Sequence, residues 1–533
     1  MSSIQVGNLP ISDFTPGAYI SVNAPSGAFS GLNGPKSALL MGLCLASSYA
    51  AVNNLVDGYV FGPNQSYSVT NESDVVNYFG AGSELHLGFL RFTATNQGSP
   101  LFFLPVKETT ANAQAAQTVT MGGTSATGNG IVTIFVSGRS ATIGFATGDV
   151  VASSIVPAIV AAINSNASWP VTASNSGAGV LVITAKQHGA RGNFIRTAVK
   201  IAGTSSGVTS SAQNFGFLTS GGLTEESWTN ALATIDPLSF GYIVPSAQDC
   251  AASGGNTTVG ASSGLGNLHG VSLQVSLQAE PLPGLRQRVM AGGFGDIAST
   301  CITNSQLLNN IRLDLVCGGS SANLTPFELA CAMAAATCAL EQGSVPQLNY
   351  DFLGNGNNNA AFNVLNPFDG TSTSHAEIAA ALVGGVTPVV AGVAGQSYVV
   401  SLITSYSINP ATGTFDPRTR DHSIVTVLDL IATQIQLMWV SSDAGKLLAN
   451  NPVPGAKPPG SNVLYPSLVQ AQINKIITNA GQNDLIQNVD ASVAATQVIR
   501  ETLNDGRVSA NIQITPISLF HQLAANLNSV SVQ

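Results

Sequence analysis

Short apolar runs alternate with helical segments through the middle of the sequence. The runs are FGYIVP (240–245), QRVMAGG (287–293) and RLDLVCG (312–318). Short buried strands separated by helices of 10–15 residues (about three to four turns) form a parallel sheet that helices cover. We expect the earlier run at 37–45 to join the same sheet. The pattern therefore predicts an α/β core made of residues 25–106 and 222–395.

A segment of different amino-acid composition separates the two parts of this core. Residues 107–221 are rich in Thr, Ser, Gly and Val, and Gly, Ser and Asn turns divide them into short segments. Strands bounded in this way predict a β-rich module inserted into the core. The expected strands are 131–136, 140–145, 180–186 and 195–201, and the expected helix is 154–164.

The C-terminal part mixes helices with strands. We expect a strand after residue 396, a helix from Asp421 or Ser423 to about Trp439, helices at 465–480 and 491–503, and a strand at 508–516. Residues 396–526 are therefore assigned to a C-terminal α+β domain. Short alternating segments stand at both ends of the sequence, so we expect an arm over 1–24 and a strand over 527–533.

The chain is almost uncharged. Charged residues make up 8%, against about 25% in typical soluble proteins, whereas 44% of residues are hydrophobic. The surface must be covered largely by Ser, Thr, Asn, Gln and Gly, which suits packing against further copies of the chain. The net charge of −9 and the lack of any run of Lys and Arg argue against direct nucleic-acid binding.

Three further features bear on where the chain is made. The first residues have neither a basic nor an apolar region, so we expect no secretory signal. The apolar stretch 378–395 is interrupted by Gly384, Gly385 and Pro388, which predicts a helix end, a turn and a strand rather than a membrane span. The six cysteines show no CxxC spacing, and we expect all of them to be reduced and buried.

Catalytic motifs are weak throughout. GTSSG (203–207) and GASSG (260–264) match G-x-S-x-G, but neither has the strand, turn and helix that expose a nucleophilic serine. GPKS (34–37) precedes a strand, whereas a phosphate-binding loop follows one. The histidines are scattered and form no metal-ligand pair. These patterns predict no catalytic residue, no cofactor and no metal.

The stretch FDPRTRDH (415–422) gathers charges in a chain that has few. It joins an expected strand to the long helix, and Gly413 and Pro417 supply turn chemistry. Asp421 stands where its carboxylate would cap the first turn of that helix. We therefore predict a structural role, helix cap and turn, for Asp416, Arg418, Arg420 and Asp421.

Seven segments together span nearly the whole chain. They are TPGAYISV (15–22), KSALLMG (36–42), VTASNSGAGVLVITAKQHGARGN (171–193), FGYIVPSAQD (240–249), AMAAATCALEQGSVPQLN (332–349), LITSYSINPATGTFDPRTRDHSIVTVLDLIATQI (402–435) and ANIQITPISLFHQLAANLNSVSVQ (510–533). In this order the chain resembles the tail sheath proteins of contractile-tailed bacteriophages, in particular the Mu-like group.

The resemblance implies a structural protein that is not an enzyme. Such subunits polymerise helically around a tail tube and contract to drive the tube through the host envelope, without consuming a nucleotide. The implied partners are further copies of the chain, the tail tube protein, and the baseplate and tail terminator proteins, with no membrane insertion. The implied location is the virion tail, assembled in the cytoplasm of the host bacterium.

The resemblance also implies roles for particular residues. Strands that link neighbouring subunits would be formed by Ala18, Tyr19, Ile20, Ser21 and Val22 and by Leu527, Ser529, Val530, Ser531 and Val532. Relatives carry more basic residues where this chain has LDLIATQIQLMW (428–439), so a tube contact made of many ion pairs is not expected. The basic residues available to face the tube are Lys446, Lys475, Arg500 and Arg507.

Three alternatives remain open. A sheath from a capsid-less, phage-like contractile injection particle would share every feature above. A polar β-rich adhesin fits the Ser- and Thr-rich module, but the missing signal peptide counts against it. A serine esterase would use Ser205 or Ser262 of the two G-x-S-x-G matches.

Overall fold

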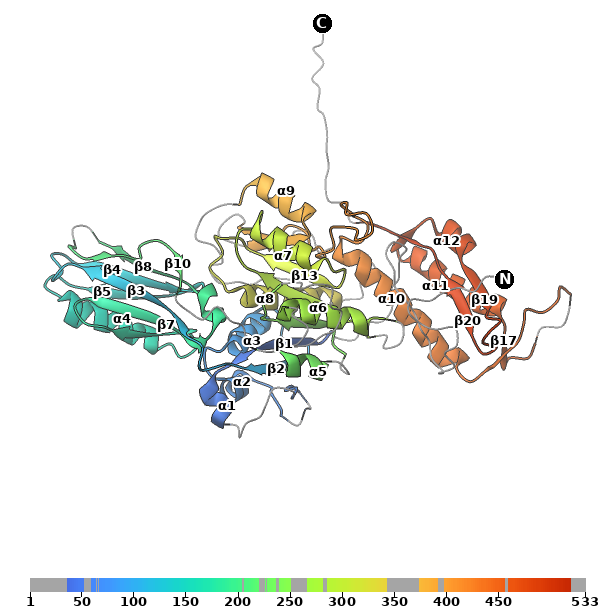
Figure 1. Ribbon diagram of the computed structural model, residues 1–533, viewed down its shortest axis with the longest axis horizontal. Helices are drawn as coiled ribbons and strands as arrows, with labels where there is room; N and C mark the ends of the chain where they lie inside the picture. Colours follow the sequence, from blue (N-terminus) through green and yellow to red (C-terminus); the bar gives the residue numbers. More distant parts are fainter. Residues whose placement is uncertain are drawn as a thin grey trace, which may run out of the picture. The chain divides into compact units, whose positions relative to one another are not determined.

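The computed structural model divides into two compact units, a core unit up to Arg420 and a C-terminal unit from Asp421 onward (Figure 1). The expected arms at 1–24 and 527–533 lie outside the described residues, as do Ser205 and Ser262. The structure describes residues 36–51, 59–63, 65, 67–203, 206–219, 226, 228–235, 239–250, 266–280, 285–342, 373–391, 397–455 and 459–518.

A seven-stranded sheet forms the centre of the core unit. Its order is β15-β14-β13-β12-β11-β1-β2, and all neighbours are parallel except β14 and β15. The run expected at 37–45 is β1, which joins this sheet as predicted; it pairs with β11 and with β2, a strand that was not predicted. The strands are β1 (Ala38–Cys44), β2 (Leu101–Lys107), β11 (Tyr242–Pro245), β12 (Arg288–Gly293), β13 (Leu313–Cys317), β14 (Val386–Ala391) and β15 (Ser397–Val399).

The boundary between the core and the C-terminal domain, predicted at 395/396, lies at 420/421 in the structure. The strand after residue 396 does not open the C-terminal unit, because β15 pairs antiparallel with β14 and covers the edge that β14 would otherwise expose. The core unit continues through the following turn to Arg420.

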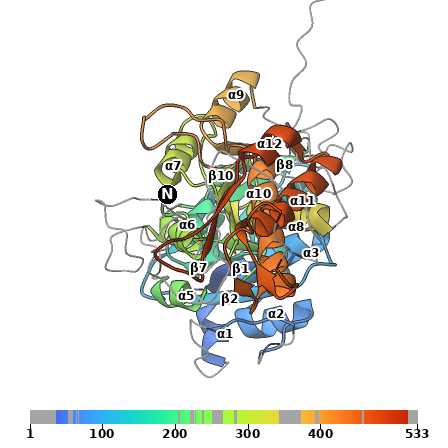
Figure 2. The same ribbon diagram turned by 90° about the vertical axis from the view of Figure 1, so that its right-hand side faces the viewer.

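Helices cover both faces of the sheet, as the alternating pattern predicts (Figures 1 and 2). On one face α3 (Glu84–Thr95) packs against α8 (Pro326–Gln342) and β1. The other face has one apolar cluster shared by α5 (Thr229–Ile235), α6 (Asn267–Gln278), α7 (Thr300–Leu308) and α9 (His375–Val383). Two further helices, α1 (Ala46–Ala51) and α2 (Glu72–Phe79), follow β1.

Residues 114–217 form two four-stranded antiparallel sheets that share one apolar cluster with α4 (Val156–Asn164). The strands and helix expected here are confirmed. Ser137 and Gly138 join β4 to β5 with φ of 43° and 75°, the two positive values of a type I′ hairpin. The strands are β3 (Gln114–Gly122), β4 (Gly130–Val136), β5 (Arg139–Phe145), β6 (Val171–Asn175), β7 (Val180–His188), β8 (Arg196–Ala202), β9 (Thr209–Ser210) and β10 (Gly216–Phe217).

The C-terminal unit packs three helices, α10 (His422–Met438), α11 (Pro466–Gln482) and α12 (Val489–Ala495), around one apolar cluster. A π-helical turn (Trp439–Asp443) continues α10. The expectation of a helix over 491–503 was wrong beyond Ala495, because β-branched residues from Thr496 onward enter a strand that pairs with β20. The short strands are β16 (Leu447–Leu448), β17 (Val463–Leu464), β18 (Ile486–Gln487), β19 (Gln497–Arg500), β20 (Val508–Asn511) and β21 (Thr515–Pro516).

Two apolar stretches bear on the membrane question. The stretch expected to hold a helix end, a turn and a strand does so, because α9 ends at Val383 and β14 begins at Val386. In the part of the chain that the structure describes, the helix His422–Asp443 is long and apolar enough to cross a membrane. Its Val427 and Ile431 lie in the apolar cluster of the C-terminal unit, as expected for the core helix of a globular unit.

The expectation that all six cysteines are reduced was wrong for two of them. Cys44, Cys250, Cys331 and Cys338 are buried thiols, as predicted. Cys301 and Cys317 instead form a disulfide. The sequence spacing offered no sign of this pair, because the sheet brings the end of β13 beside the first turn of α7.

Candidate functional site

The charged stretch singled out in the sequence forms a local clamp around a turn. The carboxylate of Asp416 accepts hydrogen bonds from Arg418 Nε at 2.8 Å, Arg418 Nη2 at 2.7 Å and Tyr406 Oη at 3.1 Å. The Arg418 guanidinium lowers the pKa of Asp416 to about 2. The carbonyl oxygen of Arg420 also accepts from Thr404 N at 2.7 Å, which holds the end of the turn in place.

Asp421 occupies the N-cap position of α10, but its side chain makes no capping hydrogen bond. The predicted side-chain cap is therefore wrong. Ile424 N instead bonds to the main-chain carbonyl of Asp421 at 3.2 Å. The clamp at Asp416 orders this stretch, since its Oδ1 accepts from the main-chain N of Arg418 at 3.1 Å as well as from the guanidinium.

The basic residues expected to face a tube all lie in the C-terminal unit. Lys446 pairs with Asp443 at 3.4 Å, and Arg507 Nε donates to Ser509 Oγ at 3.2 Å. Arg500 donates to Asn450 Oδ1 at 3.1 Å, which brings β19 beside the segment after β16. Lys475 is exposed on α11.

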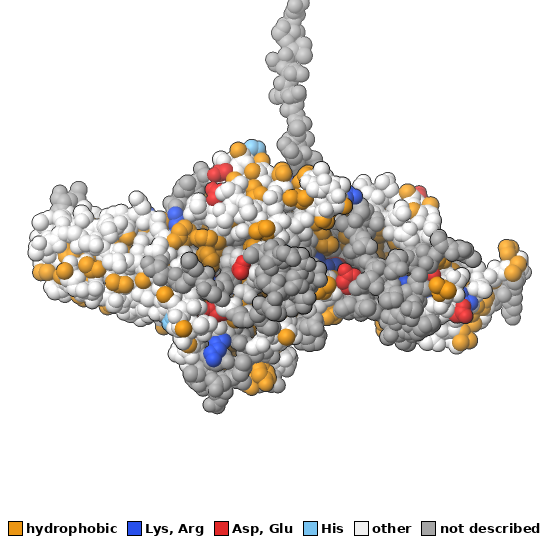
Figure 3. Space-filling model, viewed as in Figure 1, with side chains coloured by type: hydrophobic (Ala, Val, Ile, Leu, Met, Phe, Trp, Pro, Cys, Tyr) orange, Lys and Arg blue, Asp and Glu red, His pale blue; other side chains and the backbone are white. Residues whose placement is uncertain are grey.

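A second set of charges, which the sequence did not single out, lies where residues 114–217 meet the α/β sheet. We call this set the junction. On the face seen in Figure 3, charged side chains are sparse among the described residues. The junction instead holds its charges inside the core unit. Its charged members are Glu84, Arg91, Glu108, Arg139, Lys186, Arg191, Arg196 and Glu328.

Glu328 is the centre of the junction. Its side chain is fully buried on the first turn of α8, and its Oε1 receives Arg139 Nη2 at 2.6 Å and Arg91 Nε at 3.2 Å. Arg139 comes from β5 and Arg91 from α3, so one carboxylate joins the inserted strands to two helices of the core. Burial alone would raise the pKa of Glu328, but the two arginines outweigh it and hold that pKa below its usual value.

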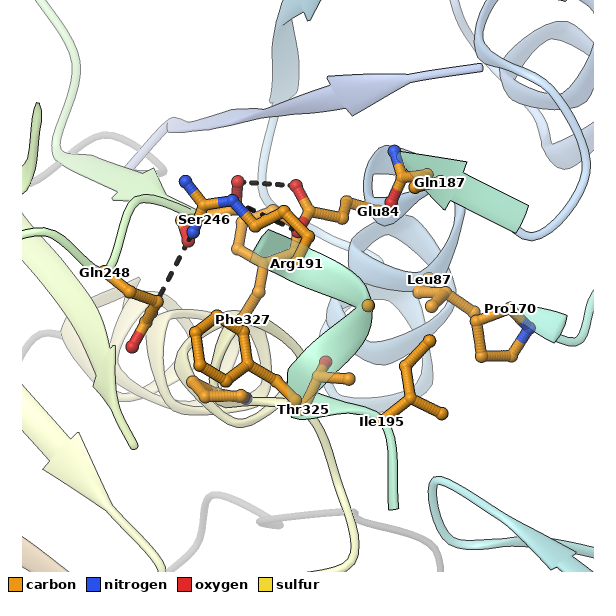
Figure 4. A pocket seen from close by; sticks show the side chains of 13 residues that line it. Glu84, Leu87, Pro170, Gln187, Arg191, Ile195, Ser246, Gln248, Thr325 and Phe327 are labelled. Atoms are coloured by element: carbon orange, nitrogen blue, oxygen red, sulfur yellow. Dashed lines mark hydrogen bonds and ion pairs between the residues drawn. The ribbon is translucent and has the colours of Figure 1, made fainter. Parts of the chain in front are cut away.

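A second carboxylate, Glu84, opens α3 and faces Arg191 (Figure 4). Glu84 Oε2 accepts from Ser246 Oγ at 2.6 Å and from Leu43 N at 3.0 Å, and Arg191 Nε lies 3.8 Å from Oε1. Arg191 Nη1 also donates to the carbonyl oxygen of Ser246. Burial raises the pKa of Glu84, and Arg191 opposes this shift.

These side chains line a small cavity between the inserted strands and the core, walled in part by Thr325 and Phe327 (Figure 4). Thr325 also completes the first turn of α8. Its Oγ1 lies 3.2 Å from Glu328 Oε2 and accepts from Glu328 N at 3.4 Å. Thr325 and Glu328 thus stand in the spacing of a capping box, with Pro326 between them.

Aromatic rings reinforce the same junction. Phe294, which follows β12, lies 4.5 Å from Phe194 and 5.1 Å from Phe217 between ring centroids. Arg196 donates to the carbonyl oxygen of Ser321 at 2.7 Å and stands over the Phe217 ring at 5.6 Å. Cation–π and aromatic contacts of this kind add to the burial of apolar area.

Two further polar contacts tie the loops of the core to β7. Lys186 Nζ donates to the carbonyl oxygen of Ala81 at 3.0 Å, and burial lowers its pKa. Glu108 Oε2 accepts from His188 N at 2.9 Å. Gly82, with φ of +81°, allows the approach, because a Cβ there would collide with the Trp169 carbonyl oxygen.

The charged groups of the junction contact one another, so the junction holds the inserted strands against the α/β sheet of the same chain. Sequence reasoning missed it, since its ion pairs join residues that are distant along the chain. Two signals were present. Thr325 and Glu328 have capping-box spacing, and the segment KQHGARGN (186–193), part of the sheath resemblance, carries Lys186, His188 and Arg191.

Known proteins were compared with this chain by family, by sequence and by structure. A scan against models of protein families gave no match, and a search of curated proteins gave none. Among solved structures, the sheath tail protein from Desulfitobacterium hafniense has a TM-score of 0.44 at 13% identity, covering 94% of this chain and 96% of that chain. A chain of the anti-feeding prophage baseplate has a TM-score of 0.45 at 8% identity, covering 97% and 100%.

A flagellar cap protein from Escherichia coli matches 19% of this chain and 37% of its own length, with a TM-score of 0.12 and 26% identity. At these identities and TM-scores the matches name no family for this chain.

Proposed function

We propose that this chain is a structural, non-enzymatic subunit of a contractile phage tail sheath. It polymerises helically around a tail tube and contracts to drive the tube through the host envelope. The observation that carries the proposal is the ordered series of sheath-like segments, which begins at TPGAYISV (15–22) and reaches the last residue.

The C-terminal unit offers places for linking strands. In the described part of this unit, β19 and β20 form a two-stranded ladder, so each strand has one side whose main-chain groups pair with no other strand. Such sides accept an added strand through main-chain hydrogen bonds. The arms at 18–22 and 527–532 alternate and carry no charge, which suits them to this pairing.

The junction supports the same proposal mechanically. Contraction would require the inserted strands and the α/β sheet to move as one body. Buried ion pairs and close aromatic contacts resist shear, because separating them exposes uncompensated charges to an apolar interior.

The proposed partners are further copies of the chain, the tail tube protein, and the baseplate and tail terminator proteins. The proposed location is the virion tail, after assembly in the bacterial cytoplasm. Lys446, Lys475, Arg500 and Arg507 are the proposed basic contacts to the tube.

Negative-stain electron microscopy of the purified chain tests the proposal. We expect hollow, helically striated cylinders, and a monodisperse monomer at high concentration would argue strongly against a sheath. Deleting residues 1–24 or 527–533 should block polymerisation and leave a folded monomer. Normal cylinders from either truncation would overturn the assignment of that arm.

A sheath from a capsid-less contractile injection particle would make the same cylinders. Neighbouring genes for a capsid and a terminase distinguish the phage from this alternative.

A further inference from the structure

Cys301 and Cys317 lie at the carboxyl end of the parallel sheet. Cys317 is the last residue of β13, and its neighbour across the ladder is Gly293, the last residue of β12. Cys301 belongs to the first turn of α7. A Cβ on Gly293 would lie 3.2 Å from Cys301 Sγ, so the glycine leaves room for the two sulfurs to meet.

The other cysteines lie elsewhere in the core unit. Cys44 ends β1, and Cys331 and Cys338 are fully buried in α8. Burial raises the pKa of the Cys331 and Cys338 thiols well above the usual value, which suppresses the reactive thiolate. Cys250 is also a buried thiol.

We propose that Cys301 and Cys317 form a redox-responsive crosslink, a pair of thiols in a reducing cytoplasm and a disulfide after the chain leaves it. Only the cytoplasmic starting point rests on the proposed function. Disulfides are rare in reducing compartments and persist in oxidising ones. The crosslink thus joins α7 to β13 after folding and assembly.

A small-molecule disulfide is a sufficient oxidant. Cys301 and Cys317 are fully buried in the folded chain, so the first turn of α7 must open locally before the thiolate of one cysteine attacks the small disulfide. The attack forms a mixed disulfide and releases one small thiol. The second cysteine then attacks the protein sulfur of the mixed disulfide, forming the Cys301–Cys317 bond and releasing the second small thiol. Both cysteine protons end on the two released thiols, so the protein loses two electrons and the oxidant gains them.

The crosslink closes a loop with a sequence separation of 16. It restricts the unfolded chain, so we expect oxidation to raise the Tm of the core unit by a few degrees.

The test uses the full chain expressed in a bacterial cytoplasm. Cells are quenched in acid, denatured and alkylated with N-ethylmaleimide, and the intact mass should show all six cysteines modified. A second sample, purified under reducing conditions and then treated with glutathione disulfide while folded, should show four modified, with peptide mapping joining Cys301 to Cys317. Its Tm should exceed that of the reduced sample.

Cys301→Ser with Cys317→Ser should abolish both the mass change and the Tm rise, whereas Cys250→Ser should retain both. Six modified cysteines after oxidation, a different pair, or a stable glutathione adduct would overturn the proposal. So would a disulfide already complete in the quenched cells. Cylinder formation is scored separately, so loss of the sheath proposal and loss of the crosslink are distinguishable.

Discussion

Two charged clusters of the core unit differ in nearly every physical respect. Asp416 and Arg418 are two positions apart; the Asp416 side chain is 6% exposed, but the Arg418 side chain is 51% exposed. Glu328 is 237 positions from Arg91 and 189 from Arg139, and its side chain is fully buried. The first cluster is conspicuous in the sequence, and the second is not.

In a chain with few charges, the effect of a charge on stability depends on its burial. Water reaches the exposed guanidinium of Arg418 and screens its pairing with Asp416, so this pair contributes little to stability. A buried carboxylate between two arginines has no water to replace a lost partner, so removing one member leaves charge uncompensated. The local cluster orders a turn, whereas the distant one holds two parts of the core unit together.

The largest expected effect comes from Glu328→Ala. It leaves Arg91 and Arg139 buried without a counter-charge, and we expect a loss of about 3–5 kcal/mol. Denaturant unfolding followed by circular dichroism measures it. Replacing all three residues by Met should recover most of the stability, because no buried charge remains. A loss below about 1 kcal/mol for Glu328→Ala would remove the contrast between the clusters.

Arg191→Met should have an intermediate effect. Glu84 keeps its hydrogen bonds from Ser246 and Leu43, so we expect a loss of about 1–3 kcal/mol. Lys200→Met is the control. Lys200 is a half-buried lysine on β8 whose Nζ lies over the Phe135 and Phe215 rings but faces no buried carboxylate in the described contacts, so its loss should be smaller. Equal losses of unfolding free energy for the two variants would show that the contacts of Arg191 with Glu84 and Ser246 do not stabilise the junction.

Acidification should separate Glu328 from Glu84. The folded-state pKa of Glu328 lies below its usual value of 4.5, so the stability that it confers is present above about that pH and is lost as the pH falls further. The folded-state pKa of Glu84 lies above 4.5, so its ionised form destabilises the folded chain at neutral pH and protonation relieves this.

Unfolding midpoints between about pH 7 and 3 should therefore change in opposite directions when wild type is compared with Glu328→Gln and with Glu84→Gln. The advantage of wild type over Glu328→Gln should shrink at the acidic end. Relative to Glu84→Gln, wild type should gain as the pH falls toward 4.5. Slopes of the same sign would contradict these assignments.

The smallest effect is expected from Asp416→Asn, a Tm change of about 1 °C or less, since Arg418 is largely in water. The folded-state pKa of Asp416 is about 2, against the usual 3.8, so its contribution is present above about 3.8 and lost as the pH falls toward 2. A loss of stability as large as that expected for Glu328→Ala would show that the Asp416 cluster matters as much as the Glu328 cluster.

Much of the fold followed from local patterns. Apolar runs such as 37–45 and 312–318 became β1 and β13 because a strand buried on both faces must be apolar along its whole length. The sequence-based predictions were wrong where pairing between distant strands determined the secondary structure. The strand after residue 396 joined β14, and the helix expected to reach 503 ended at Ala495.

The alternation of strands and helices, the inserted β-rich segment and the scarcity of charge can all be read from the amino-acid sequence, because they depend on neighbouring residues and composition. The contacts of Glu328 with Arg91 and Arg139, and of Cys301 with Cys317, are visible in the folded chain alone. Such contacts depend on which strands become neighbours in the sheet, and no local spacing along the chain encodes that order.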